Sequence, residues 1–408
     1  MFLHSWIPAR ARYCGLGRND VQTDALLRNT MHGDQMHLRL GFSVLSLVEI
    51  LFLFLTGNVL GASLNDPAWE KVIGAGKKEG KVVVFGPPGN DVRDAYTIGF
   101  QKKYPEIEVD FNSMQGAQVA PKLMAELKAQ QYRTDLVIAG TTTALEGLAP
   151  VNAIVPMQPF LIGPETRDLS KWKGAKLHVS DDAEKYNLVF GSRVQVAFVY
   201  NRDSLAPGKI KSWRDLLNPE WKGKIAMLDP RRAGGGLDIC TFWYTNEKLG
   251  LGTNFVKQLF TSQDIFTSNE ERQIVDFVAR GRYPIAIGPS GTLAFQLKAQ
   301  GLPVELFGSA GLQEGGFVTA SNGTISVVKN APHPNAAKLY LNYVLSSEGQ
   351  AAWSKASGLA SLRRDVSRDH IPEILVPHEG ASYQETYREK YVLMRREIVD
   401  LLNTVIRR

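Results

Sequence analysis

The feature that most constrains this fold is an alternation of apolar, β-branched runs with segments of helical periodicity. Lys81–Phe85 (KVVVF) predicts a buried strand, and Val92–Tyr104, closed by Pro105, predicts a helix. The same order of strand, helix and strand continues at Ile107–Phe111, Val119–Gln130 and Leu136–Ala139. Strands that alternate with helices build a mostly parallel sheet covered by helices on both faces. We therefore expect an α/β fold.

A second alternating series occupies the middle of the chain. Its expected strands are Ile225–Leu228, Ile265–Phe266, Ile285–Ile287 and Val304–Leu306. Its expected helices are Leu237–Leu249, Phe255–Phe260, Ile274–Ala279 and Leu293–Ala299. Val194–Tyr200 lies between the two series and is long enough to cross from one lobe to the other. Thr324–Val328 is expected to return. Two α/β lobes joined by two crossover strands predict a cleft and a hinge.

The chain is therefore expected to consist of an upstream part and two lobes. Residues 1–62 are expected to be an upstream extension plus a signal peptide. Residues 63–190 and 323–408 build the first lobe, and the inserted residues 191–322 build the second. The tail Tyr383–Arg408 has apolar residues at helical spacing, so we expect one long helix docked on the first lobe.

Leu40–Leu60 is the long apolar stretch of the upstream part. Basic residues precede it and small residues end it, which is the order of a secretory signal. We expect Met31 or Met36, not Met1, to be the start, and the signal to be cleaved from about residues 37–62. The protein would then be periplasmic or otherwise extracytoplasmic. The alternative is a membrane anchor, since about 20 apolar residues can cross a bilayer.

Charge and cysteine content exclude several classes of protein. The formal net charge of +6 is spread over isolated doublets, so no nucleic-acid partner is expected. Cys14 and Cys240 are the two cysteines, and only the second would remain after cleavage, which leaves no disulfide and no thiolate metal cage. The histidines lack metal-ligand spacing. We expect no cofactor, no bound metal and no catalytic residue.

Two loops of the first series are candidate ligand contacts. In open α/β sheets, ligands bind where the carboxyl ends of strands lead into helix N-termini. This rule selects Pro88, Gly89 and Asn90 after the first strand, and Thr141 and Thr142 after the third. Free backbone N–H groups and the helix dipole there favour an anionic or polar group. The alternatives are a plain turn in the first loop and a helix cap in the second.

The second series has a richer loop, D-P-R-R-A-G-G-G, at residues 229–236. Arg231 and Arg232 have the geometry to clamp a carboxylate or phosphate, unless they are solvated surface cations. Gly234 and Gly235 allow close approach of the backbone to a ligand.

Two further residues complete the candidate site. Ser290 follows a later strand and either bonds a ligand or caps a helix. Arg193 precedes the crossover strand and is expected to point into the cleft.

The most distinctive sequence motifs follow the expected returning strand, Thr324–Val328. Lys329–Tyr340 reads K-N-A-P-H-P-N-A-A-K-L-Y, and Leu345–Gln350 reads L-S-S-E-G-Q. These motifs closely resemble the extracellular solute-binding proteins of bacterial ABC importers, in the branch that includes ferric-iron binders and their relatives for organic or anionic solutes. The resemblance extends more loosely from Trp69 to Arg364.

The resemblance implies a two-lobed periplasmic-binding-protein fold, type II-like, in a monomer that makes and breaks no bond. Such a protein captures a small molecule between its lobes and delivers it to the membrane subunits of an ABC permease. The arginines and helix N-termini favour an anion such as a carboxylate, phosphate or phosphonate compound. The identity of the solute and of the permease stays open.

Two alternatives to an anion carrier remain. One is ferric iron, which the iron-binding relatives hold with adjacent tyrosines in the loop that corresponds to residues 289–291. No tyrosine stands there, and Tyr283 precedes the strand, at its wrong end. The other is an enzyme on the same scaffold that uses Cys240 or a cleft carboxylate.

Overall fold

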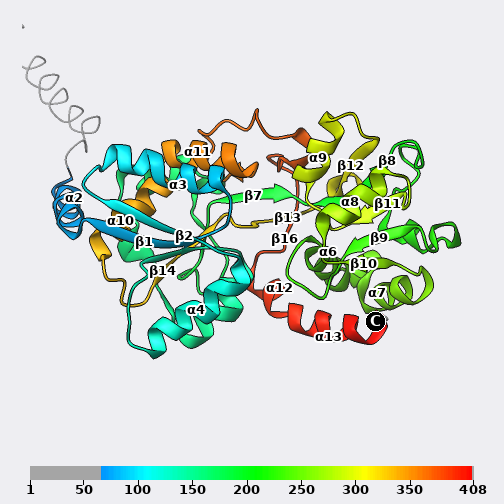
Figure 1. The fold of residues 1–408 in the computed structure, drawn as a ribbon, viewed down its shortest axis with the longest axis horizontal. Helices are drawn as coiled ribbons and strands as arrows, with labels where there is room; N and C mark the ends of the chain where they lie inside the picture. The colour runs from blue at the N-terminus through cyan, green and yellow to red at the C-terminus, as the bar shows by residue number, and fades with distance from the viewer. Residues whose placement is uncertain (1–65, 407–408) are drawn as a thin grey trace, which may run out of the picture. The chain divides into compact units, whose positions relative to one another are not determined.

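Three β-sheets organise residues 66–406, the part of the chain that the computed structural model describes (Figure 1). Sheets of seven and five strands are covered by helices, and a four-stranded sheet lies between them. Within residues 66–406, no helix combines the length and apolarity needed to span a bilayer. The expected signal region, Leu40–Leu60, lies outside the described residues.

The seven-stranded sheet uses strands from distant parts of the chain. These are β1 (Lys81–Gly86), β2 (Glu108–Ser113), β3 (Leu136–Ile138), β4 (Ile154–Val155), β5 (His178–Val179), β6 (Leu188–Val189) and β14 (Thr324–Val328). The strand order is β2-β1-β3-β14-β6-β5, and β4 also pairs with β14. β1 is parallel to β2 and β3, as predicted, whereas β14 is antiparallel to β3 and β6. We call this sheet with its helices the first lobe.

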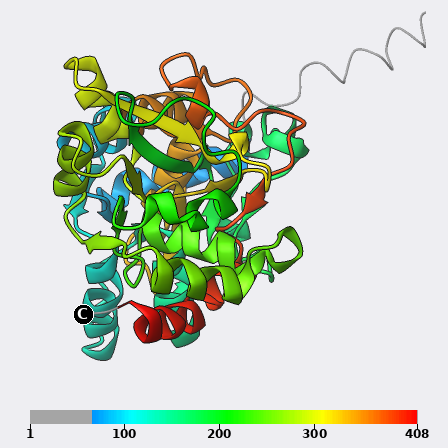
Figure 2. The ribbon, with the colours of Figure 1, turned by 90° about the vertical axis from the view of Figure 1, so that its right-hand side faces the viewer.

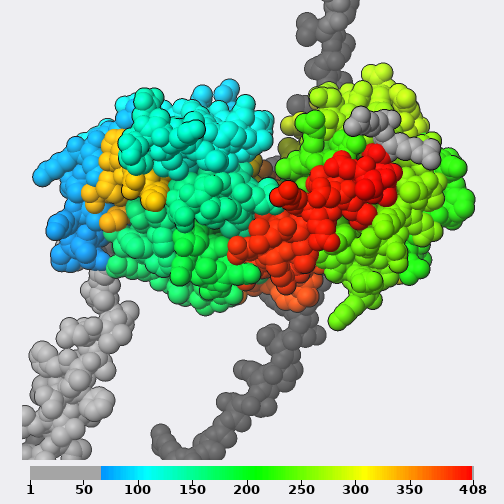
Figure 3. All heavy atoms as spheres, turned by 90° about the horizontal axis from the view of Figure 1, so that it is seen from below, coloured from blue at the N-terminus to red at the C-terminus, as the bar shows by residue number. Residues whose placement is uncertain are grey.

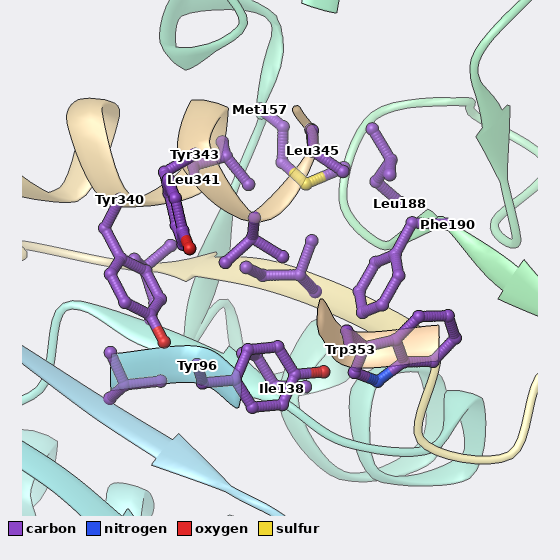
Figure 4. Packing of buried hydrophobic residues seen from close by; sticks show 14 of the residues in the cluster. Tyr96, Ile138, Met157, Leu188, Phe190, Tyr340, Leu341, Tyr343, Leu345 and Trp353 are labelled. Carbon is purple, nitrogen blue, oxygen red and sulfur yellow. The ribbon is translucent and has the colours of Figure 1, made fainter. Parts of the chain in front are cut away.

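The helices of the first lobe bury aromatic side chains against the sheet. They are α2 (Pro67–Glu79), α3 (Asn90–Lys103), α4 (Gly116–Lys128), α5 (Pro164–Arg167), α10 (Pro334–Val344) and α11 (Ser347–Ser357). Figure 4 shows Tyr340 and Tyr343 of α10 over the sheet, with Trp353 of α11 beside Phe190. The rings of Phe190 and Trp353 meet edge-on, with centroids 4.8 Å apart, a geometry that aromatic pairs favour.

The five-stranded sheet belongs to the second series. Its strands are β8 (Val196–Asn201), β9 (Ile225–Leu228), β10 (Phe266–Ser268), β11 (Ile285–Ile287) and β12 (Val304–Gly308), in the order β10-β9-β11-β8-β12. Its helices are α6 (Gly235–Thr245), α7 (Gly252–Ser262), α8 (Glu271–Ala279) and α9 (Gly291–Ala299). Trp213, Trp243 and Phe255 pack together in its core. This sheet with its helices is the second lobe.

The four-stranded sheet connects the lobes. Its strands are β7 (Gly191–Val194), β13 (Phe317–Thr319), β15 (Ala360–Ser361) and β16 (Gln384–Glu385), in the order β15-β7-β13-β16. The single crossover strand predicted at Val194–Tyr200 is instead divided at Gln195, because β7 and β8 belong to different sheets. Thr324–Val328 is a strand as predicted, but it lies inside the first lobe, and β13 makes the crossing.

A further segment, residues 362–383, also leaves the first lobe. Ile371, Leu375 and Val376 are buried in a core cluster of the second lobe. The chain then returns through β16. The lobes are therefore linked by more than the two predicted crossover strands.

The C-terminal tail differs from the prediction in its helices and in the lobe on which it packs. It forms two helices, α12 (Glu389–Leu393) and α13 (Arg395–Val405), and α13 packs on α6 and α7 of the second lobe (Figure 2). Ile398 and Leu402 are fully buried in the same core cluster as Trp243. The prediction of one long helix on the first lobe was wrong, because an apolar stripe does not specify which core it fills.

Candidate ligand-binding site

The loop after β1 leads into an uncapped helix. Pro88, Gly89 and Asn90 are exposed, and α3 begins at Asn90. Gly89 has a φ of 122°, which glycine adopts without the strain that a side chain would bring. No side chain caps α3. The N–H groups of its first turn are therefore available to water or to a ligand.

The threonine loop after β3 has a different role from a simple helix cap. Thr141 is buried, and no side-chain cap is formed at Thr142. The Oγ1 of Thr142 instead accepts a hydrogen bond from Nη1 of Arg395 at 2.6 Å. Thr142 thus contacts the C-terminal tail, although the two residues are 253 positions apart.

The glycines of the second-lobe loop serve contacts between backbone segments. A Cβ on Gly235 would lie 2.1 Å from the carbonyl oxygen of Gly288, and one on Gly236 would lie 2.2 Å from that of Leu228. Gly234 has a φ of 145°, and α6, like α3, has no side-chain cap. Glycine is thus required for α6 to begin against the ends of β9 and β11. The predicted close approach of a ligand to Gly234 and Gly235 stays a prediction.

The two arginines of this loop differ in their surroundings. Arg231 donates two hydrogen bonds to Asp229, from Nε to Oδ1 at 2.9 Å and from Nη2 to Oδ2 at 2.7 Å. Burial opposes ionisation of Asp229, but the hydrogen bonds and charge of Arg231 outweigh it and lower the pKa of that carboxyl. Arg232 is exposed. Arg231 must therefore leave Asp229 before it can clamp a ligand.

Arg193 lies where the lobes meet. It pairs across the connecting sheet with Thr319. Burial lowers the pKa of Arg193, while the nearby carboxylates of Asp238 and Glu271 oppose that shift. Glu271 accepts a hydrogen bond from the backbone N–H of Ser290 at 2.6 Å. The structure thus brings Arg193 and Ser290 to the same acidic side chain, Glu271.

Three residues at this position escaped the sequence analysis. Asp238 lies in the first turn of α6 and accepts a hydrogen bond from Nη2 of Arg395 at 2.5 Å. Gln195 is 2% exposed, and its Oε1 has no hydrogen-bond partner among residues 66–406. Only Asp238 had a sequence signal, an acidic side chain just after a glycine loop. Arg395 had none, since Asp238 is 157 positions away.

The groups gathered here are suited to binding. Uncapped helix N-termini and the guanidinium of Arg193 are suited to a polar or anionic molecule. Cys240 is fully buried, as the sequence indicated, and burial raises the pKa of its thiol well above the usual value, so the reactive thiolate is disfavoured. Among the described residues, no cluster of three His, Cys, Asp or Glu side chains is placed to hold a metal ion.

Two surface hollows lie away from these residues. One, of about 530 Å³, is in the first lobe, and the other, of about 780 Å³, is in the second. Charged residues that line them are Lys81, Asp110 and Lys122 in the first and Lys209, Arg214 and Glu220 in the second. Neither hollow is lined by a predicted ligand residue.

Comparison with known proteins gives a consistent result. The family model for bacterial extracellular solute-binding proteins matches residues 95–374. An uncharacterized protein of Haemophilus influenzae is 27% identical over 323 residues, which cover 76% of this chain and 85% of that relative.

Solved structures of the same architecture carry different ligands. Iron-bound HitA from Pseudomonas aeruginosa matches with a TM-score of 0.60 and 17% identity. The match covers 80% of this chain and 99% of the HitA chain. AfuA from Actinobacillus pleuropneumoniae, with fructose-6-phosphate bound, has a TM-score of 0.58 and 19% identity at the same coverage. At these identities the likeness concerns the fold. It confirms the predicted two-lobed α/β architecture of periplasmic binding proteins.

Proposed function

The chain belongs to the family of bacterial extracellular solute-binding proteins, and we propose that it captures a small anionic solute between its lobes for delivery to an ABC importer. Solute binding outside the cytoplasmic membrane is the function of this family. The preference for an anion such as a carboxylate or a phosphate compound is our inference from the site.

Arg193 is the observation that carries the anion proposal. Arg193 is half-buried, and burial lowers the pKa of its guanidinium. Among residues 66–406 its side chain forms no hydrogen bond or ion pair, so its N–H donors are open to water or to a ligand. An anion that accepts two parallel N–H bonds from the guanidinium would form a charge-assisted pair with it. The uncapped N-termini of α3 and α6 provide additional donors on either lobe.

Such a ligand would also drive closure of the lobes. A shift from 1:99 to 99:1 in favour of the closed form requires about 5.5 kcal/mol of differential binding. Charge-assisted hydrogen bonds contribute about 1.5–3 kcal/mol each. Two to four bonds formed only in the closed form are therefore sufficient.

Ferric iron and enzymatic turnover have less support. Pro289, Ser290 and Gly291 occupy the loop where tyrosine ligands would be needed, and the ring of Tyr283 stacks on Phe266 with centroids 5.5 Å apart. Cys240, the candidate nucleophile, is buried in the core of the second lobe.

The first test identifies the ligand. Mass spectrometry of the natively purified protein would detect a retained solute, and a thermal-shift screen would compare inorganic phosphate, citrate, fructose-6-phosphate and ferric iron. A ligand at 100 times its Kd stabilises the folded state by about 2.7 kcal/mol. We expect at least one anion to raise the melting temperature. A shift with iron alone would contradict the proposal.

The second test concerns the arginine. Arg193→Gln should raise the Kd of the stabilising anion about 10-fold to 100-fold, because a charge-assisted pair is lost. Arg202→Gln, an exposed arginine of the second lobe, is the matched control and should leave the Kd unchanged. Arg231→Ala and Arg232→Ala test the loop separately. Isothermal titration calorimetry measures all four, and an unchanged Kd in Arg193→Gln would contradict this role.

A further inference from the structure

We propose that Arg395 is a positioning residue that clasps the two ligand loops, and with them the two lobes, to each other. Nη1 of Arg395 donates to Thr142 of the first lobe at 2.6 Å, and Nη2 donates to Asp238 of the second at 2.5 Å. One side chain from the C-terminal helix thus joins the helix turn after β3 to the first turn of α6. The inference rests on the proposed function, since it takes these loops to be the ligand loops.

The burial of Arg395 sets it apart from a surface ion pair. The residue is 7% exposed, and its Nε is buried without a hydrogen-bond partner among the described residues. A buried guanidinium is strongly unfavourable unless it is paired and hydrogen-bonded. The next residue, Arg396, is exposed on the same helix. Arg395 therefore depends on both of its acceptors, one in each lobe.

The docking of α13 determines which bond would break when the lobes separate. Ile398 and Leu402 fix α13 in the core of the second lobe, so Arg395 stays with Asp238. The bond to Thr142 is the one that spans the lobes. α12, which precedes it, contacts the turn Thr143–Leu148 of the first lobe. Figure 3 shows this tail, in red, reaching across from one lobe to the other.

The charges around Asp238 connect the clasp to ligand binding. Asp238 lies near Arg193 and is hydrogen-bonded to Arg395 and, at 3.5 Å, to Thr319. Glu146 is also close, since Arg395 opposes the upward shift that burial imposes on the pKa of Glu146. When Arg395 neutralises Asp238, the guanidinium of Arg193 is left for an external anion.

Interlobe distance is the direct test. Spin labels at Met124→Cys on α4 and Leu249→Cys in the second lobe, both exposed positions, would report the distance by pulsed electron paramagnetic resonance. The full chain carries Cys14→Ser, and Cys240 is buried. Without added ligand, Arg395→Met should lengthen and broaden the distance distribution. Arg395→Lys, which keeps the charge but not the two-pronged geometry, should give a partial effect. Arg396→Met is the matched control and should give none.

A second variant separates the clasp from a general loss of stability. Thr142→Val removes only the acceptor in the first lobe and leaves α13 docked, yet it should lengthen the distance as Arg395→Met does. The double variant should open the lobes no further than either single change, because both act on one bond. If Thr142→Val leaves the distribution unchanged, or Arg395→Met does so while folded by circular dichroism, the clasp is wrong.

The two proposals fail in different experiments. A clasp that fails the distance test leaves anion binding by Arg193 untouched, because that binding is measured by calorimetry. Confirmed opening in Arg395→Met, with no anion bound by the unmodified protein, would instead contradict the proposed function and retain the clasp.

Discussion

Arg363 and Arg364 are neighbours in sequence with opposite surroundings. Arg363 is 1% exposed, and its Nε and Nη2 donate to Asp365 at 2.9 and 2.7 Å. Its Nη1 donates to the carbonyl oxygen of Leu345 at 3.1 Å. Arg364 forms an exposed ion pair with Glu379 at 3.1 Å. Asp365 is exposed, so the ion pair itself contributes little, but the buried carbonyl of Leu345 depends on Arg363 as its donor.

We therefore expect Arg363→Met to lower the free energy of unfolding by about 1–3 kcal/mol at pH 7, because the buried carbonyl oxygen of Leu345 loses its donor. Arg364→Met, the matched control, should cost less than about 1 kcal/mol. Urea unfolding followed by tryptophan fluorescence measures both. Equal effects of the two changes would contradict the assignment of Arg363 as a buried, paired charge.

The same pair predicts a pH dependence. Hydrogen bonds from Arg363 lower the pKa of Asp365 below its usual 3.8. A carboxyl whose folded-state pKa is depressed stabilises the fold above the unfolded pKa, and this contribution is lost as pH falls through the folded value. Between pH 5 and pH 2, the unmodified protein should therefore lose more stability than Arg363→Met. A parallel decline in both would contradict the coupling.

The sequence predicted the position of the candidate ligand loops in the fold better than the partners of their side chains. Strand ends followed by helix starts placed Pro88, Thr141, Arg231 and Ser290 correctly in loops or first turns. The orientation of a guanidinium depends on neighbours that are distant in sequence. Arg395 illustrates this, since both of its partners are more than 150 positions away.

Among the elements, α13 provides the clearest prediction. Leu402 is fully buried in the core of the second lobe, whereas Leu393 of α12 is 55% exposed. Leu402→Ala should lower the free energy of unfolding by about 2–5 kcal/mol, because it leaves a cavity. Leu393→Ala should have little effect. Thermal and urea unfolding measure both variants. If Leu402→Ala and Leu393→Ala were equally stable, the docking of α13 on the second lobe would be contradicted.

Strands were more predictable than the tail. The bounds of β9 and β11 agree with the predicted Ile225–Leu228 and Ile285–Ile287, since strands buried on both faces read as short apolar runs. The break at Gln195 was not predictable, because Val194–Tyr200 (VQVAFVY) reads as one strand and a single polar residue does not mark a break. The short strands β4, β5 and β6 were also missed, since two residues provide no periodicity.

For the whole molecule, hydrogen exchange should locate the ligand. An anion that raises the melting temperature should slow exchange in both lobes at once, at residues 86–90, 140–144 and 229–238. The surface hollows that contain Lys122 and Arg214 should be unaffected. Mass spectrometry of peptic peptides measures this. Protection confined to one hollow would place the ligand outside the interlobe site.

The position of β14 has a consequence for biosynthesis. β14 stands between β3 and β6 in the middle of the seven-stranded sheet, yet it is made after the entire five-stranded sheet. A ribosome that has produced only the first 300 residues has therefore made a first lobe without its central strand. The sheet of the first lobe therefore stays incomplete until synthesis of the chain is nearly finished.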